Sequence, residues 1–240
     1  MEGRMDAVAV LFGNFQIKNT NIQIEISKIQ DLLKEYEVFG TINQSITNNS
    51  PIVMPIIEFI SRNNNINIQI GNDRINIVKP IQIDENGNKI NYNENDFITV
   101  VKDIQKKLLD FYGINGNRIS YVVNLCKTNQ KEIDEIKNKV VSNYFYKSEN
   151  TFEWSSRSAI KEHFNIKGIS EEINVITSLN FNPNRLKIVM GKNALEIYGL
   201  MYNIDINTSP INLQTRIDAE FIEQFYNQAI SLIKNIEEVY

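Results

Sequence analysis

Residues 68–77 read IQIGNDRINI, with apolar and polar residues alternating on both sides of Gly71. This alternation predicts two β-strands joined by a glycine turn, because successive side chains of a strand point to opposite faces. A polar segment follows, and residues 96–112 then place apolar side chains such as Val101 and Leu108 at helical spacing. The first half of the chain therefore contains a β-hairpin followed by an amphipathic helix.

Residues 188–197, IVMGKNALEI, repeat this pattern around Gly191. A polar segment again follows, and a second amphipathic helix is predicted at residues 218–238, at a similar distance from the glycine. We therefore predict an internal duplication of a β-hairpin-plus-helix unit. The expected fold class is α+β, with mainly antiparallel sheets and packed amphipathic helices. The two halves are residues 1–127 and 128–240, either as separate units or as one continuous domain.

The composition is that of a folded globular protein. The chain has 240 residues, of which 42% are hydrophobic and 10% aromatic, and this is enough to bury a core. It has no apolar run long enough to cross a membrane and no signal-peptide pattern, so we expect a cytoplasmic protein. Asparagine and isoleucine are frequent, as is typical of an AT-rich genome, so most asparagines carry no functional prediction.

Several shorter segments also have recognisable patterns. Residues 7–15 and residues 21–26 are predicted to be strands. Ser27 is expected to cap a short helix that ends at Gly40. Pro55 interrupts an apolar run, and because proline cannot donate to a strand ladder, this segment is expected to be an edge strand or to contain a bulge.

The sequence offers little catalytic chemistry. His163 is the sole histidine and is expected to be a surface or packing residue, while Cys126, the sole cysteine, is expected to be an apolar thiol on a strand. Acidic residues such as Asp84, Glu85 and Asp205 do not form a nuclease motif, and we predict neither a metal site nor a cofactor. An enzyme with an unrecognised carboxylate site is one alternative.

Two sets of residues are candidate partner sites. The net charge of −4 gives no general reason to expect nucleic-acid binding, but the last part of the chain is acidic and the middle is mildly basic. The acidic candidates for binding a partner protein are Glu220, Glu223 and Glu237. The candidates for binding nucleic acid are Lys102, Lys106, Lys107, Arg118, Tyr144 and Tyr146.

The order of the elements resembles that of a known family. The segments that carry the resemblance are the strand pair around Gly71, the helix start at Asp96 and Phe97, the strand at 118–125, the strand ending at 203–207 and the C-terminal helix. They resemble a sporadically distributed family of uncharacterised bacterial proteins of about this length, over most of the chain. The family's usual tryptophan at the start of the first long helix is Phe97 here. The resemblance implies a place in mobile elements or phage-conflict loci and supplies no active-site residues.

We therefore expect a non-catalytic protein-binding component of a bacterial or phage conflict system, in defence or counter-defence. The expected partner is another protein or a second copy of the chain, with no membrane association. A nucleic-acid or nucleotide-binding module of such a system is the main alternative. The motivation is the lack of catalytic motifs together with the charge asymmetry and the expected exposed sheet edges.

Overall fold

The computed structural model describes residues 3–17, 21–46, 53–83, 89–90, 92–141, 153–181, 186–190, 193–197 and 199–239. The strands of its main sheet are β1 (Gly3–Phe12), β2 (Val38–Ile46), β3 (Val53–Ser61), β4 (Ile66–Ile70), β5 (Arg74–Lys79), β8 (Arg118–Lys127), β9 (Trp154–Ile166), β10 (Ile169–Phe181) and β13 (Leu200–Thr208). The small sheets consist of β6 (Gln82–Ile83) with β7 (Lys89–Ile90), and β11 (Leu186–Met190) with β12 (Asn193–Ile197). The helices are α1 (Ile22–Leu32), the 3-10 helix η2 (Lys34–Tyr36), α2 (Glu94–Tyr112), α3 (Gln130–Val141) and α4 (Ala219–Val239).

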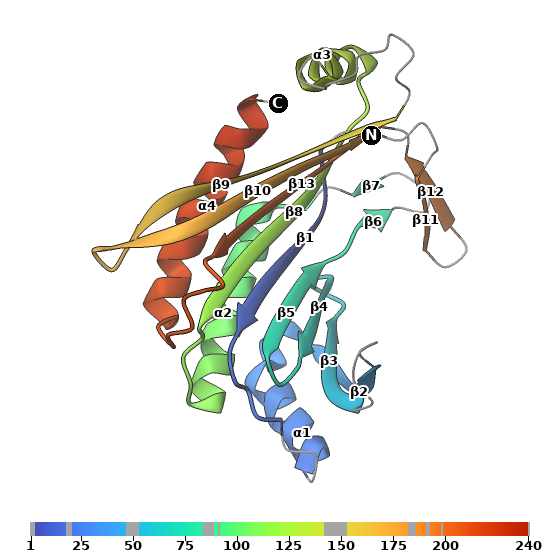
Figure 1. Ribbon diagram of the computed structural model, residues 1–240. Helices are drawn as coiled ribbons and strands as arrows, with labels where there is room; N and C mark the ends of the chain where they lie inside the picture. Colours follow the sequence, from blue (N-terminus) through green and yellow to red (C-terminus); the bar gives the residue numbers. More distant parts are fainter. Residues whose placement is uncertain are drawn as a thin grey trace.

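The main sheet has nine strands in the order β2-β3-β4-β5-β1-β8-β13-β10-β9 (Figure 1). Each neighbouring pair is antiparallel. The strand β1 pairs with β8 at the centre, β5 lies beside β1, and β13 lies beside β8. Strands from residues 1–127 and from residues 128–240 therefore belong to one sheet. The α+β class and the mainly antiparallel sheet are confirmed.

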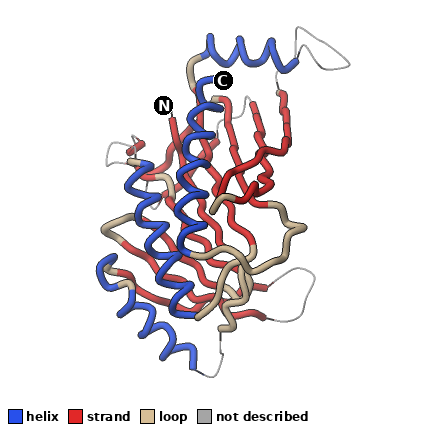
Figure 2. The backbone as a smooth tube through the Cα atoms, turned by 90° about the vertical axis from the view of Figure 1, so that its left-hand side faces the viewer, coloured by secondary structure: helices blue, strands red, loops and turns tan. Residues whose placement is uncertain are grey.

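The helices lie on one side of this sheet, which we call the covered face (Figure 2). Alternate residues of β1 point to it, and Ala7, Ala9 and Leu11 are fully buried there. The two alanines leave room for α2 and α4, whose Ile104 and Phe225 are also fully buried. Removing an apolar side chain of this size from water contributes about 1.5–3 kcal/mol. The covered face is thus the hydrophobic core of the protein.

Several elements agree with the sequence patterns. The helix α2 begins after Asn93, whose side chain accepts a hydrogen bond from the backbone N–H of Asn95 at 3.0 Å. It ends at Gly113, which has a φ of 64° and so adopts the left-handed conformation that favours glycine. The hairpin around Gly71 is present as β4 and β5, and Cys126 is buried on β8. The long helices and central strands were therefore readable from local patterns.

The strand predicted at residues 21–26 is wrong, because these residues begin α1. Ile26, Ile29 and Leu33 are buried at helical spacing, whereas Ile24 is 55% exposed. Isoleucines at alternate positions fit a strand, but the buried set continues with the period of a helix. The helix therefore starts before Ser27, which is not its cap.

Gly40 does not end a helix but lies within β2. A Cβ atom at this position would come within 2.6 Å of the Phe59 ring and 2.7 Å of the Ile26 side chain. The glycine is therefore required by close packing of α1 against the sheet. The left-handed residue after η2 is Glu37, with a φ of 47°.

The strand that contains Pro55 is not an edge strand, since β3 lies between β2 and β4. Its pairing with β4 begins only at Ile57, and Pro55 is paired with Gln44 of β2 alone. The missing N–H of the proline therefore needs no partner on the β4 side. The proline marks a local end of the ladder rather than an edge of the sheet.

The two glycine hairpins are not equivalent, so the duplication predicted from them is not supported. The Gly71 hairpin belongs to the main sheet, whereas β11 and β12 form a separate sheet, and Gly191 lies outside the described residues. The strands β12 and β13 are separate elements, and Gly199 lies just before β13. A Cβ atom on Gly199 would lie 2.3 Å from the Lys127 carbonyl oxygen. This close approach ends one hairpin and lets β13 enter the main sheet beside β8.

Candidate functional site: the open face of the sheet

The second face of the sheet is not covered by any of the described helices, and we call it the open face (Figure 1). It is made by the side chains that alternate with those of the core. Its residues include Asp6, Val8, Val10, Phe12, Glu58, Asn67, Gln69, Asn76, Val78, Arg118, Ser120, Val122, Asn124, Asn174, Ile176, Ser178, Asn203, Asp205 and Asn207, of which Ser120 and Asn207 are buried.

The strand register places polar open-face residues in rows that cross the sheet. In one row, Gln69 donates to Glu58 at 3.2 Å. On the other side of the central strands, Asn174 donates to Asn207 at 3.2 Å, and Asn207 donates to Asp205 at 3.0 Å. The first two bonds join neighbouring strands and the third joins two residues of β13, and side-chain hydrogen bonds of this kind hold the groups in fixed positions. The amides are therefore ordered across strands that are far apart in the sequence.

A second polar row runs across β1, β8 and β13. Asn124 donates to the Asp6 carboxylate at 2.6 Å, and Asn203 donates to the Asn124 carbonyl oxygen at 2.9 Å. Burial raises the pKa of the Asp6 carboxyl, against the opposing effect of the Asn124 amide. Each amide in this row uses part of its hydrogen-bonding capacity, since an asparagine side chain has two donors and two acceptor lone pairs.

An apolar strip separates the two polar rows. The register aligns Val78, Val8 and Val122 as direct neighbours, and Ile176 continues the strip beyond Asp205. These four aliphatic side chains are half-buried. The open face therefore alternates hydrogen-bonding groups with an apolar strip that Asp205 interrupts between Val122 and Ile176, and surfaces that bind other molecules combine these two kinds of contact.

Arg118 lies on the open face near the end of β8. Its guanidinium carbon is 4.8 Å from the centroid of the Phe12 ring, and its Nη2 donates to Asn207 at 3.3 Å. Stacking on an aromatic ring and a hydrogen bond both fix the guanidinium. Among the predicted nucleic-acid-binding residues that the structure describes, Arg118 lies on the open face, whereas Lys102, Lys106 and Lys107 lie on α2.

A hollow of about 490 Å³ lies at the end of the open face that β3, β4 and β5 form. The polar side chains in its lining include Gln69, Asn72, Arg74 and Asn76. Gln69 and Asn76 also belong to the open-face rows. The hollow therefore continues the polar surface into a concave part of the molecule.

The predicted lysines lie on the outer surface of the helices, where they form intramolecular ion pairs. Lys102 and Lys106 donate to the Glu223 carboxylate at 2.8 Å and 2.9 Å. These contacts hold the pKa of Glu223 below its ordinary value. Lys107 pairs with Asp103 at 2.7 Å and with Glu35. Two of the basic candidates, Lys102 and Lys106 of α2, thus face one of the acidic candidates, Glu223 of α4.

The other predicted partner residues are dispersed. Glu237 pairs with Arg4 at 3.0 Å, and burial raises the pKa of its carboxyl. Glu220 is exposed and accepts a hydrogen bond from Gln224 at 3.0 Å. Tyr144 and Tyr146 lie outside the described residues. The three glutamates therefore do not form one acidic patch.

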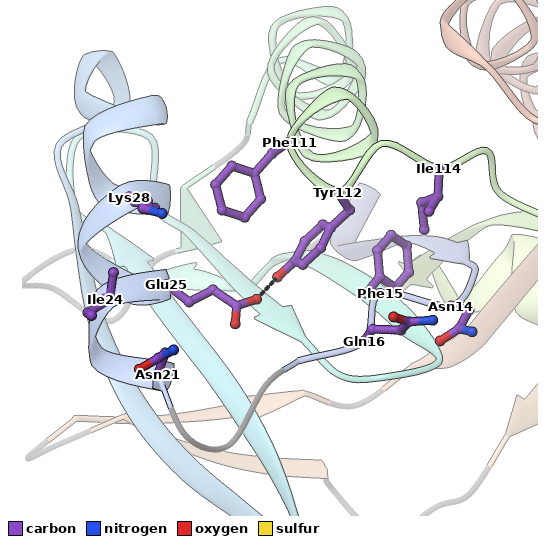
Figure 3. A pocket seen from close by; sticks show the side chains of 10 residues that line it. All are labelled: Asn14, Phe15, Gln16, Asn21, Ile24, Glu25, Lys28, Phe111, Tyr112 and Ile114. Atoms are coloured by element: carbon purple, nitrogen blue, oxygen red, sulfur yellow. Dashed lines mark hydrogen bonds between the residues drawn. The ribbon is translucent and has the colours of Figure 1, made fainter.

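A second hollow, of about 460 Å³, lies between α1 and the end of α2 (Figure 3). The Tyr112 hydroxyl donates to the Glu25 carboxylate at 2.6 Å, and the Tyr112 ring makes edge contacts with Phe15 and Phe111. Burial raises the pKa of the Tyr112 hydroxyl above its ordinary value. The residues that line this hollow include neither histidine nor cysteine, and we assign it no chemistry.

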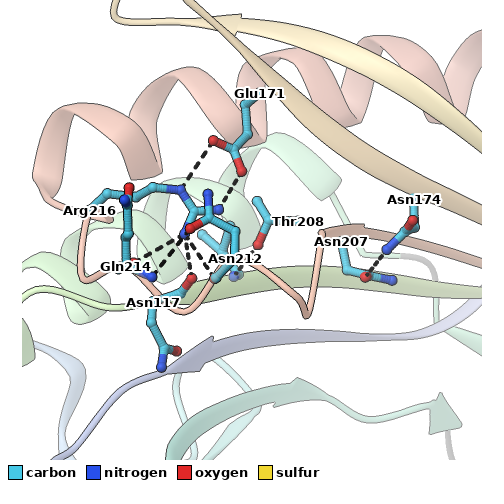
Figure 4. A network of polar contacts seen from close by, with 9 residues as sticks. Asn117, Glu171, Asn174, Asn207, Thr208, Asn212, Gln214 and Arg216 are labelled. Atoms are coloured by element: carbon cyan, nitrogen blue, oxygen red, sulfur yellow. Dashed lines mark hydrogen bonds and ion pairs between the residues drawn. The ribbon is translucent and has the colours of Figure 1, made fainter.

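A polar network fixes the loop between β13 and α4 (Figure 4). Arg216 donates from Nε to Glu171 at 3.1 Å and from Nη1 to the Asn117 carbonyl oxygen at 2.7 Å. The same Nη1 reaches the loop's own backbone carbonyls. The loop nevertheless exposes Ile211 and Leu213, which are 85% and 74% exposed. Two aliphatic side chains are thus presented on an ordered loop at the end of the sheet.

The described residues do not bring together a catalytic constellation. His163 lies on β9, and its Nδ1 is 3.2 Å from the Ser170 hydroxyl, but both residues are exposed and the nearby Glu172 pairs with Lys161. Among the residues that the structure describes, no three His, Cys, Asp or Glu side chains are grouped so that they could hold a metal ion. No helix in the described part of the chain is both long and apolar enough to span a membrane.

The open-face asparagines were not among the predicted site residues, because asparagine is abundant throughout the chain. The available signal was the alternation of these polar residues with apolar ones, as in Asn203, Asp205 and Asn207, which alternate with Ile204 and Ile206.

No protein-family model, no curated protein and no solved structure matches this chain. The case for function therefore rests on the geometry of the open face.

Proposed function

We propose that this chain is a non-catalytic binding protein that holds a partner polypeptide on its open face. The observation that carries the proposal is the arrangement of ordered amide rows on both sides of an apolar strip, on the sheet face opposite the helices. Protein surfaces that bind other proteins combine apolar contact with about one hydrogen bond per 100–200 Å². The rows and the strip supply both kinds of contact.

The charge of the open face favours a protein partner over nucleic acid. The carboxylates of Asp6 and Glu58 lie in the same rows as the amides, and that of Asp205 lies within the strip. These carboxylates would repel a polyphosphate backbone. The lysines Lys102 and Lys106 share the Glu223 carboxylate, so much of their charge is already neutralised. Backbone N–H and C=O groups of a polypeptide, in contrast, are matched by amide side chains that both donate and accept.

Nucleic-acid binding is the second candidate function, and one observation favours it. Arg118 stacks on Phe12 at the end of the open face, and stacked arginines and aromatic rings are used to bind single-stranded nucleic acid. We rank it second because the surrounding surface is mixed in charge. The resemblance to a sporadically distributed bacterial family further suggests that the partner belongs to a bacterial or phage conflict system.

A matched pair of arginine substitutions tests the proposal. Val122→Arg places a charged side chain in the apolar strip, while Ser231→Arg places the same side chain on the exposed surface of α4. Each variant is co-expressed with the products of neighbouring genes, and co-purification is measured. We expect Val122→Arg to lose at least about tenfold in affinity for the partner, as for a charge introduced into an interface, while Ser231→Arg behaves as the native chain.

The same preparations are titrated with single-stranded and double-stranded DNA and RNA at physiological salt. The proposal predicts no binding beyond a weak, salt-sensitive background. Tight binding that Arg118→Gln abolishes would instead establish the nucleic-acid alternative. Equal co-purification of the Val122→Arg and Ser231→Arg variants would show that the partner binds elsewhere.

A further inference from the structure

Two arginines flank Phe12 at one end of the open face. Phe12 is the last residue of β1, and the strand register sets it opposite Arg74 of β5 on one side and Arg118 of β8 on the other. Because Leu11 and Ile75 point to the core, the side chains of Phe12 and Arg74 point to the open face. Neighbouring strands lie about 4.8 Å apart, so the Cα atoms of the two arginines are about 10 Å apart. An anion above Phe12 is therefore within reach of both guanidinium groups.

The Arg118 guanidinium has hydrogen-bond donors without partners. It stacks on the Phe12 ring and donates from Nη2 to Asn207, but its buried Nε has no hydrogen-bond partner among the described residues. It also forms no ion pair with any residue that the structure describes. A guanidinium carries five N–H donors, and a partly buried charged group without a counter-charge is costly. The Arg118 side chain is therefore held in a position to bind an anion.

Arg74 is the more accessible arginine of the two. Its side chain is 51% exposed, and the carboxylate of Asp73, which is 70% exposed, lies 3.6 Å from its Nε. This separation is longer than a hydrogen bond, and an ion pair between two exposed side chains contributes little free energy. Arg74 can therefore exchange Asp73 for the carboxylate of another molecule.

The hollow of about 490 Å³ adjoins Arg74. Its apolar lining includes Pro55, Ile56 and Gly71, and its size falls within the range of about 300–1,000 Å³ that is usual for ligand pockets. Asn76 also lines it, and its Nδ2 lies 3.5 Å from Gln69 Oε1. The Asn76 carbonyl oxygen is then available to accept a hydrogen bond from the N–H group of a ligand.

The wall of the hollow is held by hydrogen bonds between two segments. The backbone N–H of Gly13 donates to the Asp73 carbonyl oxygen at 3.0 Å, and that of Phe15 donates to the Asn72 carbonyl oxygen at 2.9 Å. The N–H of Ile17 donates to the Asn72 side chain at 3.0 Å. These bonds join the β4–β5 turn to the segment that follows β1. The hollow is therefore preformed, which lowers the entropic cost of binding a ligand in it.

We propose that this end of the open face binds the carboxyl terminus of the partner polypeptide. The terminal carboxylate lies above Phe12 between Arg74 and Arg118, and the last side chain, which is apolar, enters the hollow. The inference rests on the proposed function and specifies which part of the partner is bound. A terminal residue carries a carboxylate and a side chain on the same Cα atom, and this matches two arginines beside an apolar hollow. An internal aspartate or glutamate has no apolar side chain beside its carboxylate.

The charges at this end favour a carboxylate over a phosphate group. The planar fork of a guanidinium matches both oxygens of a carboxylate. The Asp73 carboxylate remains at the rim, and its repulsion is weaker for a singly charged ligand than for a doubly charged phosphate. Asp205 accepts hydrogen bonds from Ser120 and Asn207 at 2.9 Å and 3.0 Å, so it is held away from pairing with Arg118.

Nuclear magnetic resonance of the full chain with defined peptide pools tests the proposal. The probe is a pool of N-acetylated tetrapeptides with three randomised residues and a terminal leucine that has a free carboxylate. At millimolar concentration, we expect it to shift the backbone amide signals of Phe12, Gly71 and Asn76 but not that of Ser231. A pool that ends in leucine amide, and one that ends in glycine with a free carboxylate, should each bind at least about tenfold more weakly, because each lacks one of the two contacts.

Substitutions on the protein separate the two contacts. Arg74→Gln and Arg118→Gln should each weaken binding of the free-carboxylate pool at least about tenfold. The matched control is Arg62→Gln, because Arg62 also lies over a ring, that of Phe39, at 5.8 Å; it should bind as the native chain does. Gly71→Leu should block the hollow, and a Cβ atom at this position comes no closer than 3.5 Å to another group.

Three results would overturn the proposal. They are the absence of shifts with the free-carboxylate pool, equal shifts with the amide pool or with inorganic phosphate, and equal losses in the Arg62→Gln and Arg74→Gln chains. The co-purified partner distinguishes this failure from failure of the proposed function. A partner that Val122→Arg releases and Arg74→Gln retains would overturn the binding of the carboxyl terminus alone. A partner that Val122→Arg retains would contradict the proposed function itself.

Discussion

The two faces of the sheet differ most clearly within a single strand, β8. Its residues Ile119, Tyr121 and Val123 point to the helices and are fully buried, whereas Val122 and Asn124 point to the open face and are half-buried. Burial of apolar area provides most of the folding free energy. The covered face therefore determines stability, and the open face can carry hydrogen-bonding rows at little cost to the fold.

The two faces also differ in how far their polar groups are exposed to water. On the covered face, the Tyr121 hydroxyl donates to the buried Glu94 carboxylate at 3.0 Å, which in turn pairs with Arg4. Leaving any of these groups without a partner in the core would be costly. On the open face, Asn124 and Asn203 remain accessible enough to exchange their partners for water or for a ligand.

The sharpest test of this difference uses adjacent residues and one substitution. Val123→Ala removes a fully buried side chain from the covered face, and we expect the free energy of unfolding to fall by about 2 kcal/mol. Val122→Ala makes the same change on the open face and should alter it by no more than about 0.5 kcal/mol. Urea denaturation measures both. Equal losses would show that the open face is covered in the folded protein.

A smaller difference between the two faces is expected in how the free energy of unfolding depends on pH. The pKa of Glu223, which lies among the helices, is lowered by hydrogen bonds from Lys102 and Lys106. It contributes stability at neutral pH that is lost as the pH falls through its folded pKa. The Glu223→Gln substitution should therefore lower the free energy of unfolding at neutral pH by less than about 1 kcal/mol, as for an exposed ion pair, and have no effect in strong acid.

Substitution of Asp6, whose carboxyl lies on the open face, should change the free energy of unfolding in the opposite direction. Burial raises its pKa, so the ionised form carries a penalty in the folded state that is present at neutral pH and vanishes below the ordinary pKa of an aspartate. Asp6→Asn should therefore stabilise the protein slightly at neutral pH and not in strong acid. Denaturation curves at both pH values measure the effect. A destabilisation at neutral pH would contradict the assignment.

Much of the fold was predictable from local patterns, and the reasons for the failures are physical. The helix α2 and the hairpin around Gly71 combine a clear period with clear end signals. The apolar residues at 21–26 fit the period of a strand as well as that of a helix. The segment is helical because Ile26 packs against Gly40. The close approach of Gly199 to Lys127 is a contact between distant parts of the chain, which no local pattern encodes.

The candidate site was harder to predict, because it depends on where the helices come to lie. Asn203 and Asn207 alternate with isoleucine in the sequence, but alternation alone does not reveal which face stays uncovered. The ion pairs of Glu223 with Lys102 and Lys106 join residues that are 121 and 117 positions apart. Local sequence patterns do not encode long-range pairing of this kind.

Photo-cross-linking in the native cells tests the open face most directly. A photoreactive amino acid is placed at Val122 in the apolar strip and, in a control chain, at Ser231 on the exposed surface of α4. We expect the Val122 chain to form a cross-link to one polypeptide on irradiation, and the Ser231 chain to form none. Cross-links from Val122 to nucleic acid alone, or identical adducts from both positions, would contradict a polypeptide-binding open face.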